Sequence, residues 1–175
     1  MPMHRDFKEL LGALNASGVR YLVIGGQAVN MYAQPRGTKD LDLWIPADPA
    51  NAQALFKALT AFGAPLDGVT PQNILKAGEF YRMGVPPVMV DILCDVTGVT
   101  FEQAWAAKQM VAIDPAAGLS AHFISREHLM TAKQIAGRPQ DLADVSAIQR
   151  HARVAQERQK LKAGKEKSKP KGRRR

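Results

Sequence analysis

Hydrophobic and polar positions recur along the chain with two periods, and the elements that these periods predict alternate between helix and strand. In residues 4–17 the apolar positions are three or four residues apart, which predicts an amphipathic helix closed by Gly18. The run VRYLVIGG at 19–26 predicts a buried strand that ends at glycine, and strict alternation over 38–45 predicts a strand with one face in the core. A short helix is predicted over 27–33, and a longer one starts at Pro49 after its cap Asp48 and ends at Gly63. Strands are predicted at 80–83 and 88–93, followed by a short helix at 101–108 and an extended segment at 111–113. Two C-terminal helices complete the chain, one capped by Ser125 and one starting at Pro139.

This order of elements predicts one domain of the α/β (α+β) class with a helical C-terminus. The 175 residues, 46% of them apolar and 6% aromatic, are enough for a single domain with its own core. No apolar run approaches the roughly 18 residues of a membrane span, and the N-terminus lacks the layout of a signal peptide. The single cysteine, Cys94, excludes an internal disulfide. We therefore expect a cytoplasmic protein with no membrane partner.

The net charge of +8 is concentrated at the C-terminal end of the chain. Residues 158–175 contain ten Lys or Arg and one acid, so they carry +9 and leave −1 on the first 157 residues. Because this end has almost no large apolar side chains, we expect 156–175 to be a disordered basic tail that follows a domain at 1–155. Such a tail is either a solubilising extension or an electrostatic arm for RNA or DNA phosphates, and the composition leaves both open.

Two glycines, Gly25 and Gly26, lie between the first predicted strand and the helix that follows it. Without side chains they let a ligand approach the backbone, and the free N–H groups at the start of a helix favour a phosphate. A tight turn would require the same residues, so the glycine pair alone does not identify a site.

Two aspartates, Asp40 and Asp42, share the polar face of the predicted strand 38–45. They lie about 7 Å apart along the strand, and they repel each other unless cations are present. Mg²⁺ is suited to this position, since it binds through one or two carboxylates together with substrate phosphates. The alternative is a solvent-facing strand surface on which Arg36 or Lys39 pairs with the acids.

A third aspartate, Asp91, lies inside the apolar run VMVDILCDV at 88–96. A carboxylate in such a run has to be paired, protonated or bound to metal, because desolvation of its charge is costly. Asp95 has the same strand parity and is an alternative to Asp91, and an aspartate at a surface edge would also fit the pattern.

Together these residues resemble the signature of nucleotidyltransferases of the polymerase-beta-like fold. That signature is an apolar residue, Gly, then Gly or Ser, a gap of nine to thirteen residues, and Asp, apolar, Asp or Glu, apolar. Here Ile24, Gly25 and Gly26 are followed by thirteen residues and then by Asp-Leu-Asp-Leu at 40–43.

Two further stretches resemble the minimal nucleotidyltransferases and the AbiEii-type toxin group. The run PRGTKDLDL at 35–43 is similar to their Arg-x-Thr-x-Asp-x-Asp form, and KQIAGRPQDLADV at 133–145 is similar to their C-terminal helical element. The likeness spans residues 20–150. It implies a small mixed sheet with helices packed on it, a core at 20–95 and C-terminal helices at 125–155.

The resemblance also implies an activity, the transfer of a nucleoside monophosphate from an NTP with pyrophosphate leaving. The catalytic and metal-binding residues would be Asp40, Asp42 and Asp91, with Mg²⁺ or Mn²⁺ as cofactor, and Asp91 would bind a second metal or deprotonate the acceptor hydroxyl. The nucleotide-binding residues would be Gly25, Gly26, Arg36, Thr38 and Lys133. For Lys133 the alternative is a helix-surface ion pair with Asp141 or Asp144, two acids that the dipole of a helix N-terminus explains.

Several hypotheses about the partners remain open at this point. The acceptor is tRNA or another RNA in a toxin–antitoxin setting, with an antitoxin or a second copy of the chain as partner, or it is a protein or a small molecule. From a different class, the chain is a catalytically silent nucleotide- or partner-binding regulatory protein of the same fold. A plain RNA-binding module is the third hypothesis, and it leaves the paired aspartates without a role.

Overall fold

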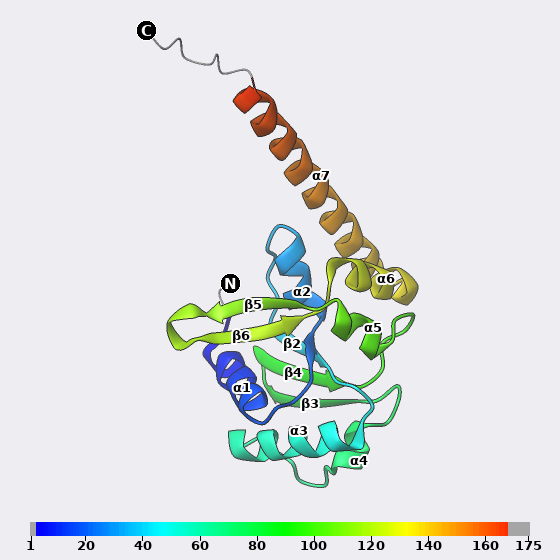
Figure 1. Cartoon of the computed structure of the whole chain (residues 1–175). Helices are drawn as coiled ribbons and strands as arrows, with labels where there is room; N and C mark the ends of the chain where they lie inside the picture. The colour runs from blue at the N-terminus through cyan, green and yellow to red at the C-terminus, as the bar shows by residue number, and fades with distance from the viewer. Residues whose placement is uncertain (1–2, 168–175) are drawn as a thin grey trace.

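A six-stranded mixed sheet forms the centre of the molecule in the computed structural model, which describes residues 3–167 (Figure 1). The strands lie in the order β3-β4-β2-β1-β6-β5. Antiparallel and parallel pairs alternate across the sheet, since β2 runs parallel to β4 and β1 parallel to β6, whereas the other pairs are antiparallel. The strands are β1 (Leu22–Val23), β2 (Asp40–Trp44), β3 (Phe80–Val85), β4 (Val88–Leu93), β5 (Gln109–Asp114) and β6 (Leu119–Phe123).

The helices form two groups on opposite sides of this sheet (Figure 1). On one side α1 (Arg5–Ala16) packs against α3 (Pro49–Phe62). On the other side α2 (Gly25–Tyr32) contacts both α6 (Arg126–Ala136) and α7 (Pro139–Lys167). The short elements are α4 (Pro71–Ile74), α5 (Phe101–Ala106) and a 3₁₀ turn at Pro115–Ala117.

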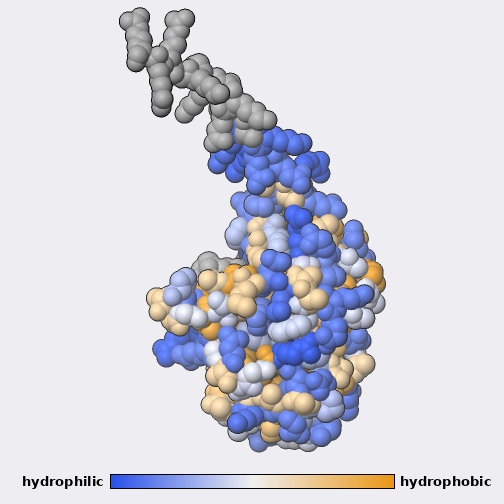
Figure 2. All heavy atoms as spheres, in the orientation of Figure 1, coloured by the Kyte–Doolittle hydropathy of each residue, from blue (hydrophilic) through white to orange (hydrophobic). Residues whose placement is uncertain are grey.

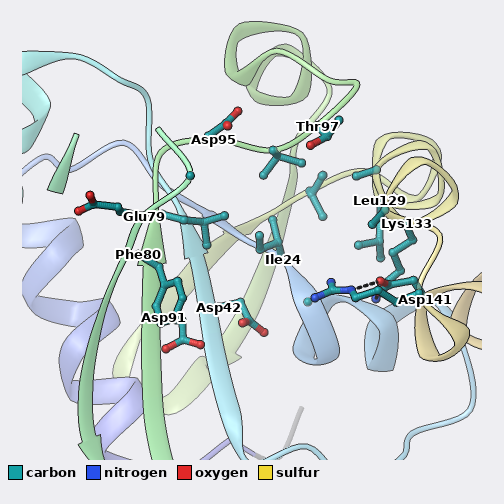
Figure 3. A pocket seen from close by; sticks show the side chains of 18 of the residues that line it. Ile24, Asp42, Glu79, Phe80, Asp91, Asp95, Thr97, Leu129, Lys133 and Asp141 are labelled. Carbon is teal, nitrogen blue, oxygen red and sulfur yellow. Dashed lines mark hydrogen bonds and ion pairs between the residues drawn. The ribbon is translucent and has the colours of Figure 1, made fainter. Parts of the chain in front are cut away.

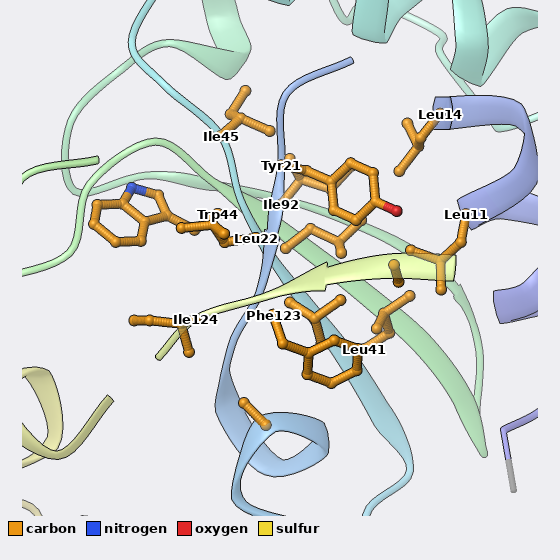
Figure 4. Packing of buried hydrophobic residues seen from close by; sticks show 14 of the residues in the cluster. Leu11, Leu14, Tyr21, Leu22, Leu41, Trp44, Ile45, Ile92, Phe123 and Ile124 are labelled. Atoms are coloured by element: carbon orange, nitrogen blue, oxygen red, sulfur yellow. The ribbon is translucent and has the colours of Figure 1, made fainter. Parts of the chain in front are cut away.

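The hydrophobic core lies between the sheet and the pair α1 and α3. The alternation in β2 sends Leu41 and Leu43 into this core, where they are fully buried, and leaves Asp40 and Asp42 half-buried on the other face. The apolar stripe of α1 supplies Leu11 and Leu14, which lie close to the side chains from the central strands (Figure 4). The opposite face of the sheet is therefore free to present its polar side chains to α2, α6 and α7.

The sequence predicted most of these elements. The α/β class is confirmed, as are the helix at 4–17, the helix from Pro49 to Gly63, both strands of the 80–93 hairpin and the two C-terminal helices. Gly63 and Gly137 have positive φ at the ends of their helices, which is why glycine marks these boundaries. The sequence analysis did not predict β6 or α4, and β1 is only two residues long.

The C-terminal helix differs from the expectation of a disordered segment that starts at residue 156. The helix α7 continues to Lys167, and it extends away from the domain (Figure 1). The residues of 150–162 are mainly strong helix formers such as Ala, Arg, Gln and Lys, so local propensity favours a helix even where little packs against it. The part of the predicted tail at 168–175 lies outside the described residues.

Within residues 3–167, none of the helices is both long enough and apolar enough to cross a bilayer. The longest, α7, is highly polar, and Figure 2 shows mainly hydrophilic residues along its exposed part.

Candidate active site

Three aspartates on neighbouring strands form what we call the sheet carboxylates: Asp40, Asp42 and Asp91. The register of the parallel pair β2 and β4 places Asp42 directly opposite Asp91. Adjacent strands are about 4.8 Å apart, so these two side chains leave the sheet next to each other. Figure 3 shows both carboxyl groups directed to the same side of the sheet.

The surroundings of Asp42 disfavour its charged form. Burial raises the pKa of Asp42, and the nearby charges of Asp91 and Asp40 raise it further. The backbone N–H of Gly26 and the charge of Lys133 lower the pKa, but they do not outweigh the other effects. The three acids therefore concentrate negative charge that the surrounding protein leaves partly uncompensated.

The glycine pair lies against Asp42. The helix α2 begins at Gly25, whose φ is +59°, and a Cβ at this position would collide with the carboxylate of Asp42. A Cβ at Gly26 would lie 2.5 Å from the Oγ1 of Thr38. The absence of both side chains thus brings the N-terminus of α2 into contact with the sheet carboxylates, and the cap residue Ile24 has no polar side chain to occupy the free N–H groups.

Asp91, and not Asp95, accompanies Asp42. Asp91 is part of β4 and is half-buried, whereas Asp95 follows the end of the strand and is exposed. Figure 3 shows Asp95 well away from Asp42, in the direction of Thr97. The carboxylate of Asp91 is also bound by Arg82, whose Nε and Nη2 donate to its two oxygens at 2.7 and 2.6 Å.

Two more aspartates, Asp141 and Asp144, form a second group that we call the helix carboxylates. Both belong to the first turns of α7, and both are buried, with 4% and 2% of their surface exposed. Lys133 of α6 lies between them, and its Nζ donates to Asp141 at 2.6 Å and pairs with Asp144 at 2.9 Å. Arg138 binds Asp141 through Nε at 2.5 Å, and Arg36 binds Asp144 through Nε and Nη2 at 3.1 and 3.0 Å.

The helix carboxylates are fully compensated by these cations. Burial by itself raises the pKa of Asp141 and of Asp144, but hydrogen bonds and charge from Lys133 reverse the shift, so the pKa of each lies below its usual value. Arg138 contributes in the same direction for Asp141, and Arg36 does so for Asp144. The helix dipole that the sequence suggested is thus only part of the reason for these acids, and the buried ion pairs are the larger part.

A cleft of about 440 Å³ separates the two acidic groups. On one wall it is lined by Gly25, Asp42 and Asp91, and on the other by Lys133 and Arg138 (Figure 3). Its remaining lining is largely apolar and includes Leu93, Val96, Ile124 and Leu129. A polyanion in this cleft would face cations on the helical wall, and on the sheet wall it would face acids that require a cation.

Two of the sheet carboxylates offer oxygen ligands that suit a metal ion. Within residues 3–167, no three His, Cys, Asp or Glu side chains are gathered as a ready metal cage. The donor set nevertheless fits Mg²⁺, because this ion takes one or two protein carboxylates and completes its shell with phosphate oxygens and water. Asp42 and Asp91 are hard oxygen donors side by side, and burial together with the charges of Asp91 and Asp40 raises the pKa of Asp42.

The predicted site residues divide into two sets. Gly25, Asp42, Asp91 and Lys133 line the cleft together. Gly26 and Thr38 lie next to each other behind Gly25, and Asp40 is two residues before Asp42 on the same face of β2.

Arg36 is engaged with Asp144, so it is tied to α7. Lys133 both lines the cleft and forms the ion pairs that its structural alternative required.

The sequence analysis missed Arg82 and Arg138. A signal for Arg82 was present, because a hairpin that pairs Val85 with Val88 across the two prolines necessarily pairs Arg82 with Asp91. No local pattern points to Arg138, since its position depends on the packing of α6 and α7 against the sheet.

The comparisons with known proteins support the fold. The chain matches no protein-family model and no curated protein. Among solved structures, it is similar to TM1012 from Thermotoga maritima, which is assigned as a nucleotidyltransferase, with a TM-score of 0.56 and 15% identity over 81% of this chain and 89% of that one. It is also similar to the antibiotic-resistance factor ANT(2'')-Ia, with a TM-score of 0.54 and 12% identity over 92% of this chain and 94% of that one. The chain therefore has the nucleotidyltransferase fold, whereas the narrower resemblance to the AbiEii-type group stays a prediction.

Proposed function

We propose that this protein is a nucleotidyltransferase that depends on Mg²⁺ or Mn²⁺ and moves a nucleoside monophosphate from an NTP to an acceptor hydroxyl. The observation that carries the proposal is the pair Asp42 and Asp91, which lie opposite each other on parallel strands beside the glycine start of α2. A purely structural pair of neighbouring acids would be expected to have matching cations, as the helix carboxylates have. The three sheet carboxylates have one ion-paired cation, Arg82, so they keep an excess of negative charge that a divalent ion would neutralise.

The residues of the cleft have distinct roles in this proposal. Asp42 and Asp91 would hold the metal, which when bound supplies positive charge to the triphosphate and to the reacting oxygens, and Asp40, on the same face of β2, would add negative charge beside them. The backbone N–H groups of Gly25 and Gly26 would donate to phosphate oxygens at the N-terminus of α2.

Across the cleft, Lys133 is held in place by the helix carboxylates and would face the triphosphate. Its neighbour Arg138 would add a second cation on the same wall. Arg36 would reach a phosphate only after leaving Asp144, while Thr38 would support Gly26 from behind.

The reaction is an in-line displacement at the α-phosphorus. The acceptor oxygen forms a bond to this phosphorus, the bond from phosphorus to the bridging oxygen breaks, and pyrophosphate leaves. Asp91 would take the proton of the acceptor hydroxyl, since it is a carboxylate that lines the cleft beside Asp42. The cations of the helical wall would stabilise the charge that develops on pyrophosphate.

Transfer can be tested directly with each α-labelled NTP, Mg²⁺ and total RNA. We expect label in the acceptor for the native chain and none for Asp42→Asn or Asp91→Asn. Asp95→Asn is the matched control, since it removes an exposed acid from the far part of the same cleft and should retain transfer. Metal-dependent binding of NTP without transfer would instead favour the catalytically silent nucleotide-binding protein.

We further propose that the acceptor is an RNA, such as tRNA in a toxin–antitoxin setting. The support is electrostatic, because residues 150–162 of α7 are mostly exposed and carry five Lys or Arg against one Glu. Cationic side chains on an exposed helix suit a phosphate backbone. A protein or small-molecule acceptor would give these cations no part in catalysis, and an antitoxin or a second copy of the chain remains the proposed protein partner.

The RNA proposal can be tested by neutralising exposed cations on the full chain. We expect Arg153→Gln, Arg158→Gln and Lys160→Gln together to weaken RNA binding and to reduce the slope of log affinity against log salt by about 2 to 3. Substitution of Arg5, Lys57 and Lys76, which lie elsewhere on the surface, is the control with the same loss of charge. Equal effects of both sets would indicate unspecific attraction.

A further inference from the structure

The acid that the proposed metal requires already has a cation of its own. Arg82 lies on β3, the edge strand next to β4, and the register places it directly opposite Asp91. Its guanidinium donates through Nε to Oδ1 of Asp91 at 2.7 Å and through Nη2 to Oδ2 at 2.6 Å. Both oxygens of Asp91 are thus engaged in a bidentate ion pair.

Arg82 is more exposed than the acid that it binds. Its side chain is 52% exposed, whereas that of Asp91 is only 14% exposed. Its Cζ lies 5.0 Å from the centre of the Phe80 ring, which comes from the same face of β3 and is itself largely exposed. Arg82 also lines the cleft, together with Asp42 and Asp91. The guanidinium therefore lines the site, is partly open to solvent and lies over an aromatic ring.

One carboxylate cannot donate the same lone pairs to a guanidinium and to a metal ion. We propose that Arg82 is an exchange residue, which leaves Asp91 when a divalent cation arrives with a triphosphate and then binds the phosphate oxygens. This inference rests on the proposed function, and it adds a phosphate-binding residue and an order of events to that function. The guanidinium keeps a bidentate anionic partner throughout, because phosphate offers the same geometry as a carboxylate.

The exchange makes metal and triphosphate binding cooperative. To hold a metal ion alone through these oxygens, Asp91 would have to release Arg82, whose guanidinium would then lack an anion. With a triphosphate bound as well, Arg82 would have phosphate oxygens as its new partner. The two ligands then strengthen each other, and the thermodynamic coupling must be reciprocal.

A second arginine in the chain shows what a purely structural pair looks like. Arg20 binds Glu102 at 2.9 and 2.7 Å, and its Cζ lies 5.2 Å from the ring centre of Phe101. This pair has the same chemistry as Arg82 and Asp91, including the aromatic ring beside the guanidinium. It lies outside the lining of the cleft, so Arg20→Gln is a matched control.

The test measures metal and phosphate binding separately, and neither measurement requires turnover. Binding of Mn²⁺ alone is followed by electron paramagnetic resonance of the free ion, and binding of inorganic triphosphate with saturating Mg²⁺ is followed by calorimetry. For Arg82→Gln we expect Mn²⁺ alone to bind about tenfold more tightly, because its competitor is gone. We expect triphosphate to bind about tenfold more weakly, because a bidentate phosphate contact is lost.

Two other variants sharpen the test. Arg82→Lys keeps the charge without the planar fork, so both affinities should change in the same directions but less. Arg20→Gln should leave both affinities at the native values. An Arg82→Gln protein whose Mn²⁺ affinity is unchanged or weaker, or whose triphosphate affinity is unchanged, would overturn the exchange.

Failure of the inference is distinguishable from failure of the proposed function. If NTP transfer occurs and depends on Asp42 while Arg82→Gln changes neither affinity, only the exchange is wrong. If Mn²⁺ fails to bind to the native chain and to Arg82→Gln, or if binding persists in Asp42→Asn, the cleft is not a metal site and both proposals are wrong.

Discussion

The sheet carboxylates and the helix carboxylates face each other across one cleft, yet their electrostatic states are opposite. Asp141 and Asp144 are almost fully buried, and three cations compensate them, so their pKa values are lowered. Asp42 is half-buried, and desolvation by burial raises its pKa, which the acidic neighbours Asp91 and Asp40 raise further. Surface exposure alone therefore does not distinguish the two groups.

The difference between the groups is one of charge compensation, because each helix carboxylate has two cationic partners, whereas Asp42 is half-buried beside two further acids. A buried carboxylate with two cationic partners connects parts of a fold, because the removal of either partner leaves an isolated charge. Adjacent carboxylates without enough cations destabilise the free protein and are explained by a ligand that supplies the charge. The helix carboxylates would then position Lys133 and Arg138, while the sheet carboxylates would bind the metal and the reacting groups.

The largest expected effect is the loss of nucleotidyl transfer when Asp42 loses its charge, with little change in stability. For Asp42→Asn we expect transfer to fall by about 10³-fold or more, since a preorganised electrostatic contact to the reacting group is lost. We expect the free energy of unfolding without metal to stay equal or to rise by roughly 0.2–1 kcal/mol, because like charges on adjacent strands repel. Steady-state kinetics and urea denaturation measure the two effects, and a strongly destabilised variant would mean that Asp42 is a structural acid.

The converse substitution at the helix carboxylates should act first on stability. For Asp144→Asn we expect the free energy of unfolding to fall by about 3 kcal/mol, because Arg36 and Lys133 lose a buried partner. The control is Asp114→Asn, which breaks a partly exposed pair with Lys8 and should cost less than about 1 kcal/mol. Equal losses from the two variants would contradict the difference between compensated and uncompensated acids.

The pH dependence of stability should have opposite signs for the two groups. The pKa of Asp42 is raised above its usual 3.8, so its penalty is absent below that pH and grows as the pH rises from there toward the folded-state pKa. The pKa of Asp144 is lowered, so its contribution to stability is complete above pH 3.8 and is lost as the pH falls through the folded-state pKa. In metal-free buffer we expect the free energy of unfolding of Asp42→Asn to rise relative to that of the native chain as the pH rises from 3.8. The free energy of unfolding that Asp144→Asn loses relative to the native chain should shrink as the pH falls below 3.8.

Much of the fold was predictable because local signals and tertiary structure agree in this chain. The cap at Asp48, the glycines that end α3 and α6, and the alternation in β2 each identify an element without knowledge of its neighbours. The strand β6 was missed although Leu119, Ala121 and Phe123 alternate with two polar residues, and although it pairs with the adjacent strand β5 across a short connection. Only its pairing with β1 is made over a long distance in the sequence. The length of α7 was underestimated because composition was given more weight than helix propensity.

The site was predictable in part. The convergence of Asp42 and Asp91 follows from their positions on two strands, but the choice of Asp91 over Asp95 required the register of β2 and β4. The engagement of Arg36 and Lys133 with the helix carboxylates could not be predicted, because it depends on how α6 and α7 dock on α2. Hydrophobic periodicity specifies which face of a helix is buried, and it does not specify which buried charges meet.

The most direct test of the metal site is anomalous diffraction from crystals grown with Mn²⁺ and a non-hydrolysable NTP. We expect a manganese peak about 2.1 Å from carboxylate oxygens of Asp42 and Asp91, with the triphosphate between this peak and Lys133. A manganese peak elsewhere, or none, with the triphosphate outside the cleft, would contradict the assignment of the sheet carboxylates as the site of metal-dependent chemistry.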